Sequence, residues 1–364
     1  MREVKVRLGA RSYPIFVGAG ILPEVGSLAR PYLSGGRVLV VTNPAVASLY
    51  AEIVERSLVA AGFTVGRAEI PDGEEYKTLS TVARLYDAAL DAALERGDAV
   101  LALGGGVVGD VAGFLAATYM RGVAFVQVPT TLLAQVDSSV GGKVGVNHPR
   151  GKNLIGAFYQ PRLVVADTRT LVSLSAREIR AGVAEVIKYG VIYDAAFFGW
   201  LEANIEALLN LEDTAVEEAV AISCTIKAAV VSADETEKEL RAILNFGHTL
   251  GHALEAATGY GRFIHGEAVA IGMVFAARLA EHLGYFNAAG VERVAALVRR
   301  AGLPTTIPPD VSADALLDAM RRDKKVAAGE LTFILPEAIG KVRIVRGVPV
   351  AAVRAALLEW QTGK

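Results

Sequence analysis

Residues 99–110, Ala-Val-Leu-Ala-Leu-Gly-Gly-Gly-Val-Val-Gly-Asp, decide the fold of the first half of the chain. The apolar run 99–103 predicts a buried strand, three glycines end it, and residues 110–120 are expected to be helical. Glycines let the backbone approach a pyrophosphate closely, and the start of a helix adds partial positive charge. The order strand, glycines, helix therefore indicates dinucleotide binding. A tight turn without a ligand remains the alternative, because the spacing is not G-x-G-x-x-G.

Short apolar runs alternate with helical patterns on both sides of this stretch. Such alternation is typical of a parallel sheet of the dinucleotide-binding kind. Strands are expected at 4–8, 15–17, 37–42, 64–70, 123–128 and 163–166, and helices at 45–61 and 79–95.

The pattern changes after residue 168, where long amphipathic stretches replace the strands. We therefore expect an α/β Rossmann-like domain over residues 1–167 and an all-α, metal- and substrate-binding domain over residues 168–364. The helices of the second domain are expected at 176–192, 195–209, 214–233, 248–258, 266–283 and 290–301, with a small β element at 331–335 and 342–345.

Composition excludes several classes of protein. Of the 364 residues, 52% are hydrophobic and 21% are charged, which suits two folded domains and argues against disorder. The net charge of −2 gives no basic excess for nucleic acid, and no polybasic run suggests a membrane surface. Apolar runs also end short of the ~18 residues that a membrane span needs.

Cysteine usage and the first residues bear on the compartment. Cys224 is the one cysteine, so no disulfide can form within the chain, which fits a reducing cytoplasm. The charged, alternating start MREVKVRLG is unlike a signal peptide. We expect Cys224 to be a small buried hydrophobe, and His148 and His282 to lie at the surface.

Lysine is the less common cation in this chain, with 11 lysines against 26 arginines. A compact ammonium and a guanidinium are not interchangeable, so lysines gathered in distinctive stretches indicate an anionic substrate with phosphate or carboxylate groups. Taken singly, each lysine is better explained as a solvated surface charge. Two of them fall in what we expect to be one long loop, residues 138–158. The seven lysines are Lys77, Lys143, Lys152, Lys188, Lys227, Lys324 and Lys325.

Three of the five histidines lie between positions 248 and 265. His248 and His252 are four residues apart, on one face of an expected helix that Asn245 could cap, and His265 begins another helix. Such imidazoles can share one divalent cation, and a carboxylate would complete a three-ligand centre with open positions for substrate. Glu185 is the candidate, on an otherwise apolar helix. The motif lacks the glutamate of H-E-x-x-H, which disfavours a metalloprotease. Surface histidines are the alternative.

Three polar stretches are further candidates. The turn 72–77 (DGEEYK) follows a strand, so its carboxylates could accept ribose hydroxyls and Lys77 could meet a phosphate. Thr130 and Thr131 follow the strand 123–128, at the strand end where ligands bind in such sheets. The charged run 234–241 leads into the histidine helix and is expected to line the metal site. Each of the charged stretches also fits a solvated turn.

Together these motifs resemble the 3-dehydroquinate synthase family, the cyclising enzymes of the shikimate pathway, over nearly the whole chain. Three residues depart from the family pattern: Val144 stands for a usual Thr, Glu239 for Gly and Thr332 for Arg. The resemblance is carried by residues 71–77 (PDGEEYK), 104–110 (GGGVVGD), 119–122 (YMRG), 129–143 (PTTLLAQVDSSVGGK), 151–158 (GKNLIGAF), 185–190 (EVIKYG) and 245–255 (NFGHTLGHALE).

The resemblance implies NAD+ and one zinc or cobalt ion as cofactors. It assigns the ion to Glu185, His248 and His265, and leaves His252 beside the ion or in contact with substrate. Residues 170–174 would close over the cofactor. The implied NAD+ site comprises Asp72, Gly73, Glu74, Glu75, Tyr76, Lys77, Gly106, Val107, Val108, Gly109, Asp110, Thr130, Thr131, Asp137, Lys143, Lys152, Thr170, Leu171 and Leu174.

The implied substrate is a sugar acid phosphate, 3-deoxy-D-arabino-heptulosonate 7-phosphate, which the family converts to 3-dehydroquinate and phosphate. Oxidation by NAD+, phosphate elimination, reduction and an intramolecular aldol step would regenerate NAD+ in each turnover. Family members are homodimers, and Arg121 is expected to reach the neighbouring subunit's site. The implied catalytic and substrate-binding residues are Lys152, Asn153, Lys188, Lys227, Glu237, Arg241, Asn245, His252 and Arg121, with one of Lys324 or Lys325.

Three other functions compete with this one. A sugar phosphate cyclase acting on sedoheptulose 7-phosphate or glucose 6-phosphate would share the plan, although Lys188, Arg241 and Asn245 suit a carboxylated substrate better. A metal-dependent glycerol or alcohol dehydrogenase would release NADH and would need fewer lysines for phosphate. A catalytically silent nucleotide sensor would have no use for three metal ligands.

Overall fold

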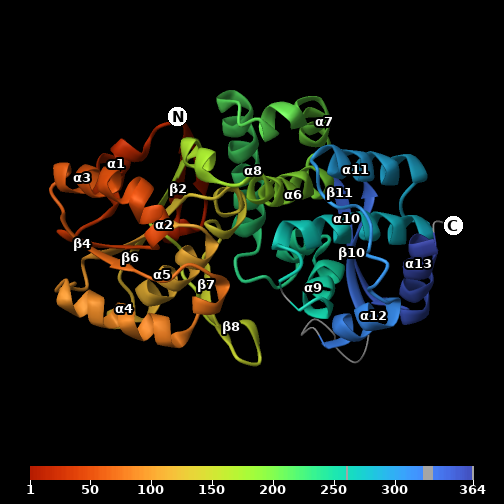
Figure 1. Ribbon diagram of the computed structural model, residues 1–364. Coiled ribbons are helices and arrows are strands. Elements are labelled where there is room, and N and C mark those ends of the chain that lie inside the picture. Colours follow the sequence, from red (N-terminus) through yellow and green to blue (C-terminus); the bar gives the residue numbers. More distant parts are fainter. Residues whose placement is uncertain (260, 323–330, 363–364) are drawn as a thin grey trace. The chain divides into compact units, whose positions relative to one another are not determined.

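The computed structural model describes residues 1–259, 261–322 and 331–362 (Figure 1). The chain divides into two compact units: the first comprises Met1–Leu174 and Val216–Thr236, and the second comprises Ser175–Ala215 and Glu237–Lys364. The sequence placed the boundary at 167/168 and assigned everything after it to the second domain. The difference arises because the short helix Thr168–Ser173 buries Leu171, and because a long helix returns to pack on the first unit.

The first unit is built on a seven-stranded sheet in the order β1-β2-β9-β6-β5-β3-β4. The strands from β2 to β4 in this order are parallel, and β1 pairs with β2 in antiparallel fashion. The strands β9-β6-β5-β3-β4 have the order of a doubly wound sheet: β4 lies on one side of β3 and β5 on the other, so the strand order switches between β3 and β5. The strands are β1 (Arg2–Val6), β2 (Tyr13–Gly18), β3 (Arg37–Thr42), β4 (Thr64–Glu69), β5 (Ala99–Gly104), β6 (Ala124–Pro129) and β9 (Leu163–Asp167).

Both faces of this sheet are buried, as continuous apolar strands require. Along β5, Ala99, Leu101 and Leu103 pack against one pair of helices. Val100 and Ala102, which point to the opposite face, pack against the other pair. The helices on the first face are α1 (Val25–Ala29) and α3 (Glu52–Ala60), joined to the short α2 (Pro44–Val46), and those on the second are α4 (Leu79–Asp91) and α5 (Gly106–Thr118).

Residues 143–158, expected to be a long loop, form an antiparallel hairpin of β7 (Lys143–His148) and β8 (Gly151–Phe158). Val144 and Val146 alternate on one side of β7 and join the core above α5. Gly145 faces Gly156 so closely that a Cβ on Gly145 would lie 2.4 Å from the carbonyl oxygen of Ile155. The glycines that suggested a flexible loop thus serve close strand pairing.

Helix α8 (Asp213–Ala233) carries the returning segment of the first unit. The carboxylate of Glu217 accepts the backbone N–H of Ala19 (2.9 Å), and the Cys224 thiol donates to the carbonyl of Gln135 (3.2 Å). As expected, Cys224 is buried, and His148 and His282 are exposed.

The Cys224 thiol is expected to be inert in the folded protein. Burial raises the pKa of Cys224 to about 12, so the reactive thiolate is absent at neutral pH. We expect no labelling by Ellman's reagent in buffer at about pH 8, and one equivalent of label after unfolding in guanidinium. Rapid stoichiometric labelling of the native protein would contradict the packing of α8.

The second unit is helical with one β hairpin, as the sequence predicted. Helix α10 is its centre: residues 268–277 are all buried, and α6, α9, α11, α13 and β10 pack against it (Figure 1). Two helices, α12 and α13, were not predicted. The elements are α6 (Ala176–Ile192), α7 (Ala195–Leu209), α9 (His248–Ala257), α10 (His265–His282), α11 (Ala288–Arg300), α12 (Ala313–Arg322), β10 (Leu331–Ala338), β11 (Lys341–Val348) and α13 (Val350–Thr362).

In the described part of the chain, every helix is either too short or too polar to cross a lipid bilayer.

Candidate metal centre and cofactor site

Three side chains from three helices of the second unit converge on one point. Glu185 of α6 is fully buried, His248 begins α9, and His265 begins α10. One ligand atom from each lies within 4.8 Å of the other two. The Oε1 atom of Glu185 is 3.7 Å from Nε2 of His248 and 3.6 Å from Nε2 of His265. A buried carboxylate thus faces two imidazole nitrogens.

Two glycines of α10 bring these helices together. A Cβ on Gly266, the residue after His265, would lie 2.1 Å from the carbonyl oxygen of Ala181, one turn before Glu185 on α6. A Cβ on Gly272 would lie 1.9 Å from the carbonyl oxygen of Gly247, the residue before His248. Backbone therefore packs directly on backbone at both crossings, and the ligand helices approach more closely than side chains would allow.

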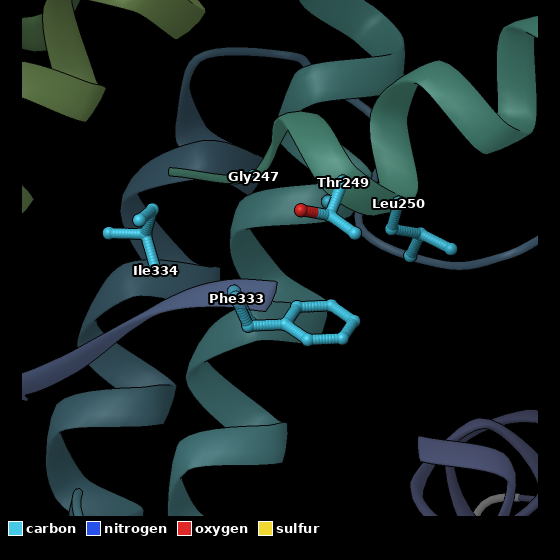
Figure 2. Close-up of a pocket in the computed structure, with 7 residues that line it drawn as sticks. Gly247, Thr249, Leu250, Phe333 and Ile334 are labelled. Carbon is cyan, nitrogen blue, oxygen red and sulfur yellow. The ribbon is translucent and has the colours of Figure 1, made fainter. Parts of the chain in front are cut away.

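The start of α9 packs against β10. Figure 2 shows Gly247 and Thr249 of the helix start opposite Phe333 and Ile334. The Thr249 hydroxyl donates to the backbone carbonyl of Thr332 (3.2 Å). The space between these residues is too narrow for a water molecule, so it is packing that supports the helix start rather than a ligand cavity.

The imidazole of His248 is held neutral and oriented. Burial lowers its pKa well below the usual value, despite the nearby charge of Glu185. Its Nδ1 lies 3.0 Å from the carbonyl oxygen of Phe246, a partner that can only accept, so Nδ1 carries the proton. The lone pair of Nε2 is then directed at Glu185, which is the arrangement that metal-binding histidines require.

His265 lies between two carboxylates. Its Nε2 faces Glu185, and its Nδ1 is 3.7 Å from Oε2 of Glu255. Burial by itself lowers the pKa of His265, but Glu185 and Glu255 together outweigh that effect and raise it to about 10. In the metal-free protein His265 is therefore protonated. Its positive charge, instead of that of a metal ion, balances the nearby carboxylates.

The donor set fits a divalent transition metal. Ligands at about 2.0–2.1 Å from a tetrahedral zinc lie roughly 3.4 Å apart, close to the 3.6 and 3.7 Å measured here. Two imidazoles and one carboxylate suit zinc or cobalt and leave further coordination positions open. The other carboxylate oxygen of Glu185 contacts the buried ammonium of Lys188, which holds the carboxylate in place.

Metal binding is expected to strengthen as the pH rises. Because metal-free His265 is protonated below about pH 10, each bound ion must displace one proton. The apparent affinity for Co²⁺ should rise about tenfold per pH unit between about pH 6.5 and 8.5. Titration calorimetry in two buffers of different ionisation enthalpy measures the protons released. If no protons were released on Co²⁺ binding, the assignment of a protonated His265 to the metal-free protein would be wrong.

Two details of the sequence-based metal site are corrected. Spacing treated His248 and His252 alike, but the structure separates them: His248 groups with Glu185 and His265, whereas His252 groups with Glu255 and His265. The backbone carbonyl that orients His248 turns its Nε2 towards α6 instead of His252. Asn245 does not cap α9, because Gly247 occupies the N-cap in a left-handed conformation and Asn245 donates to Glu237 instead (2.8 Å).

The first unit has its own ligand-binding features at the carboxyl ends of the strands. Residues 106–110, expected to precede a helix, form the first turn of α5, with Gly105 as N-cap. The first helical bond runs from Gly109 to Gly105 (3.0 Å), so three backbone amides precede the hydrogen-bond ladder. Thr130 follows β6 and lies beside these amides, because its N–H donates to the carbonyl of Gly104 (3.0 Å). This amide-rich edge can hold an anionic group.

A buried lysine ties the turn 72–77 to α5 and the hairpin. The ammonium of Lys77 donates to Asp110 (2.5 Å) and to the side-chain oxygen of Asn153 (2.6 Å). Burial raises the pKa of Asp110, and Lys77 offsets this only in part. Glu74 accepts from Asn147 of β7 (2.8 Å). The structure therefore gathers these predicted residues into one network.

The remaining predicted residues of the first unit fall into three groups. Lys227 of α8 donates to the side chain of Asp137 (2.7 Å), so these two predicted residues are partners. Lys143 and Lys152 are exposed on the hairpin, whereas Thr170 and Leu171 are buried in the short helix before Leu174. The roles predicted for Gly73, Glu75, Tyr76, Thr131 and these residues stay predictions.

Two predicted arginines lie in short helical segments of different units. Arg121 lies in a run of left-handed residues, with φ of 48° at Met120, 69° at Arg121 and 121° at Gly122. Arg241 is buried in the second unit, on the short helix Leu240–Asn245. Lys324 and Lys325 lie outside the described residues.

The sequence analysis missed three polar residues. Asn43 follows β3 at the point where the strand order switches, and its amide donates to Asp72 (2.9 Å). Asn147 binds Glu74 and accepts the backbone N–H of Asn153 (2.8 Å). Glu255 lies three positions after His252 on the same helical face, and this spacing is the signal that could have identified it.

Comparisons with known proteins agree over nearly the whole chain. Two family models match, described as 3-dehydroquinate synthase N-terminal over residues 67–181 and C-terminal over residues 182–326. The 3-dehydroquinate synthase of Pelotomaculum thermopropionicum is 58% identical over 348 residues, which are 96% of this chain and 94% of the relative. That of Desulforamulus reducens is 54% identical over 357 residues, which are 98% and 99% of the two chains.

Solved structures of sugar phosphate cyclases share the fold. A 2-deoxy-scyllo-inosose synthase, crystallised with carbaglucose-6-phosphate, NAD+ and Co²⁺, has a TM-score of 0.89 and 29% identity, covering 99% of this chain and 100% of that one. The 2-epi-5-epi-valiolone synthase of Streptomyces hygroscopicus, with NAD+ and Zn²⁺ bound, has a TM-score of 0.85 and 31% identity over 97% of each chain. A probable glycerol dehydrogenase from Sinorhizobium meliloti, at 18% identity and a TM-score of 0.67 over 96% of each chain, shows the fold alone. By two matching family models and two relatives more than half identical, this chain belongs to the 3-dehydroquinate synthase family.

Proposed function

We propose that this chain converts 3-deoxy-D-arabino-heptulosonate 7-phosphate to 3-dehydroquinate and phosphate, as a phosphate-eliminating lyase of the shikimate pathway that needs NAD+ and one divalent metal. The observation that carries the proposal is the convergence of Glu185, His248 and His265 from three helices of the second unit. Relatives of 54–58% identity that are named for this activity support the choice of reaction.

We assign the metal to Glu185, His248 and His265. When bound, the ion would make a substrate hydroxyl easier to deprotonate, and NAD+ would accept the hydride from the same carbon. The protein's part is electrostatic and positional. Lys188 holds the Glu185 carboxylate, and the Phe246 carbonyl fixes the ring of His248. His252 is beside the ligand set, where it can contact substrate.

We assign NAD+ to the first unit, at the carboxyl ends of its strands, where ligands bind in doubly wound sheets. The amides at the start of α5 suit the pyrophosphate, and Asp72, held by Asn43, suits a ribose hydroxyl. The cyclases of known structure that were crystallised with NAD+ support this assignment.

We assign the phosphate and carboxylate of the substrate to cations and amides of the chain. Buried ammonium and guanidinium groups bind anions strongly, because water does not compete for them. Lys188 and Lys227 are buried in this way, and so is Arg241. The proposed substrate-binding and catalytic set is Arg121, Lys152, Asn153, Lys188, Lys227, Glu237, Arg241, Asn245 and His252.

We further propose that the enzyme is a cytoplasmic homodimer. The single cysteine, buried and unable to form a disulfide within the chain, is consistent with a reducing compartment. Light scattering on the purified protein, with a mass near twice 38.3 kDa expected, tests the dimer.

A cyclase acting on another sugar phosphate is the alternative. It is less favoured because cyclases of that kind are only 29–31% identical to this chain, against 54–58% for the named synthases. A glycerol or alcohol dehydrogenase shares only the fold.

The test is phosphate release from 3-deoxy-D-arabino-heptulosonate 7-phosphate, measured with and without EDTA and NAD+. We expect many phosphates per NAD+, no net NADH, and loss of release with EDTA that Co²⁺ restores. Sedoheptulose 7-phosphate, glucose 6-phosphate and glycerol serve as comparison substrates. Release from one of these alone, or NADH formed in step with product, would overturn the proposal.

A further inference from the structure

The buried carboxylate of Glu255 lies on the far side of His265 from the proposed metal. Glu255 is only 8% exposed, and its Oε2 is 3.7 Å from Nδ1 of His265. The other ring nitrogen, Nε2, faces Glu185 at 3.6 Å. Each nitrogen of this imidazole therefore has its own carboxylate, and only one of the two carboxylates belongs to the ligand set.

A metal-binding imidazole must present a lone pair on one nitrogen and carry its proton on the other. His248 meets this requirement through the neutral carbonyl of Phe246. His265 begins α10, and its Nδ1 has Glu255 as its neighbour instead of a carbonyl. A carboxylate that accepts the Nδ1 proton fixes the ring and makes Nε2 a stronger donor to the metal.

We propose that Glu255 is a positioning residue for the metal centre, which orients His265 and keeps its proton on Nδ1. This inference rests on the proposed metal site. Glu255 is not a ligand in this proposal: His252, Glu255 and His265 also lie within 4.8 Å of one another, but the nitrogen of His265 that faces Glu255 is Nδ1, not the Nε2 that faces Glu185. With an ion already bound at Nε2 beside Glu185, the ring could bind a second ion through Nδ1 only after losing both of its protons.

The test compares Co²⁺ binding by the wild type, Glu255→Gln and Glu281→Gln. Glutamine keeps the size of the side chain and removes the carboxylate. Glu281 is on α10 with His265 but near its other end, so it is the matched control. Titration calorimetry gives affinity and stoichiometry, the visible d–d absorption reports the ligand field of cobalt, and thermal melting of the metal-free proteins reports folding.

We expect Glu255→Gln to bind Co²⁺ about 10–100-fold more weakly, with a shifted d–d band and still one ion per chain. The control should match the wild type. If Glu255→Gln does not fold, Glu255→Asp, which withdraws the carboxylate by one methylene, must show the same weakening.

Three results would overturn the inference. Unchanged affinity and an unchanged d–d band in a folded Glu255→Gln variant would give Glu255 a structural role only. Two ions in the wild type and one in the variant would make Glu255 a ligand. A wild type that binds no Co²⁺ would remove the proposed metal centre as well, which distinguishes failure of the proposed function from failure of this inference alone.

Discussion

Replacing His248 with alanine is expected to abolish metal binding at working concentrations and, with it, phosphate release. His248 supplies one of three protein ligands, with a neutral ring already directed at Glu185. Zinc sites of four ligands bind with about 10–16 kcal/mol, so one ligand is worth about 2.5–4 kcal/mol, or ~10²- to 10³-fold in affinity. Calorimetric titration with Co²⁺ and the phosphate assay measure the two effects.

His252→Ala is the matched control for this variant. His252 is on the same helix, one turn away, with its ring centre 5.4 Å from that of His248, but it is outside the ligand set of Glu185. We expect its Co²⁺ affinity to stay within about tenfold of the wild type, because all three ligands remain. If the two variants lost the metal equally, or if only His252→Ala lost it, the assignment of ligands would be wrong.

Gly272→Ala is expected to destabilise the second unit severely. A Cβ at this position would lie 1.9 Å from the Gly247 carbonyl oxygen and 3.1 Å from the Gly251 nitrogen, both of them backbone atoms that cannot rotate away. Helix α10 must then move off α9, at a cost of about 3 kcal/mol or more. For a unit of this size the melting temperature should fall by roughly 6–12 °C. Co²⁺ affinity should fall too, since Gly247 precedes His248.

Gly199→Ala on α7 makes the same chemical change where there is room. No atom lies within 4 Å of a Cβ at that position, and its backbone is helical. Alanine restricts the unfolded chain more than glycine does, so we expect a stabilisation of about 0.4–1 kcal/mol and unchanged Co²⁺ affinity. Differential scanning calorimetry of both variants measures the contrast. A Gly272→Ala protein as stable as Gly199→Ala would refute the backbone contact.

The elements of this fold follow closely from hydrophobic periodicity. The strand Arg37–Thr42, an apolar run, and the helix Ala176–Ile192, an amphipathic stretch, were predicted with their observed ends. The hairpin at 143–158 was missed because its glycines, which allow close pairing, look the same in sequence as glycines that allow flexibility. Helices α12 and α13 were also missed, although the apolar residues of α12 follow a clear helical period.

The metal centre shows where sequence reasoning stops. The residue types and helix starts of His248 and His265 could be read from the chain, and Glu185 could be nominated. Their convergence depends on Gly266 and Gly272, which act through contacts with backbone distant in sequence. The ring orientation of His248 depends on a carbonyl two residues before it, which no spacing rule includes. Spacing alone therefore treats His248 and His252 alike and cannot choose between them.

The most direct test of the central claim is an anomalous difference map at the cobalt edge from a crystal of the Co²⁺-loaded protein. We predict one peak, within about 2.3 Å of a Glu185 oxygen and of Nε2 of both His248 and His265. A peak bound by His252 and Glu255 instead, or no peak in the second unit, would contradict the account.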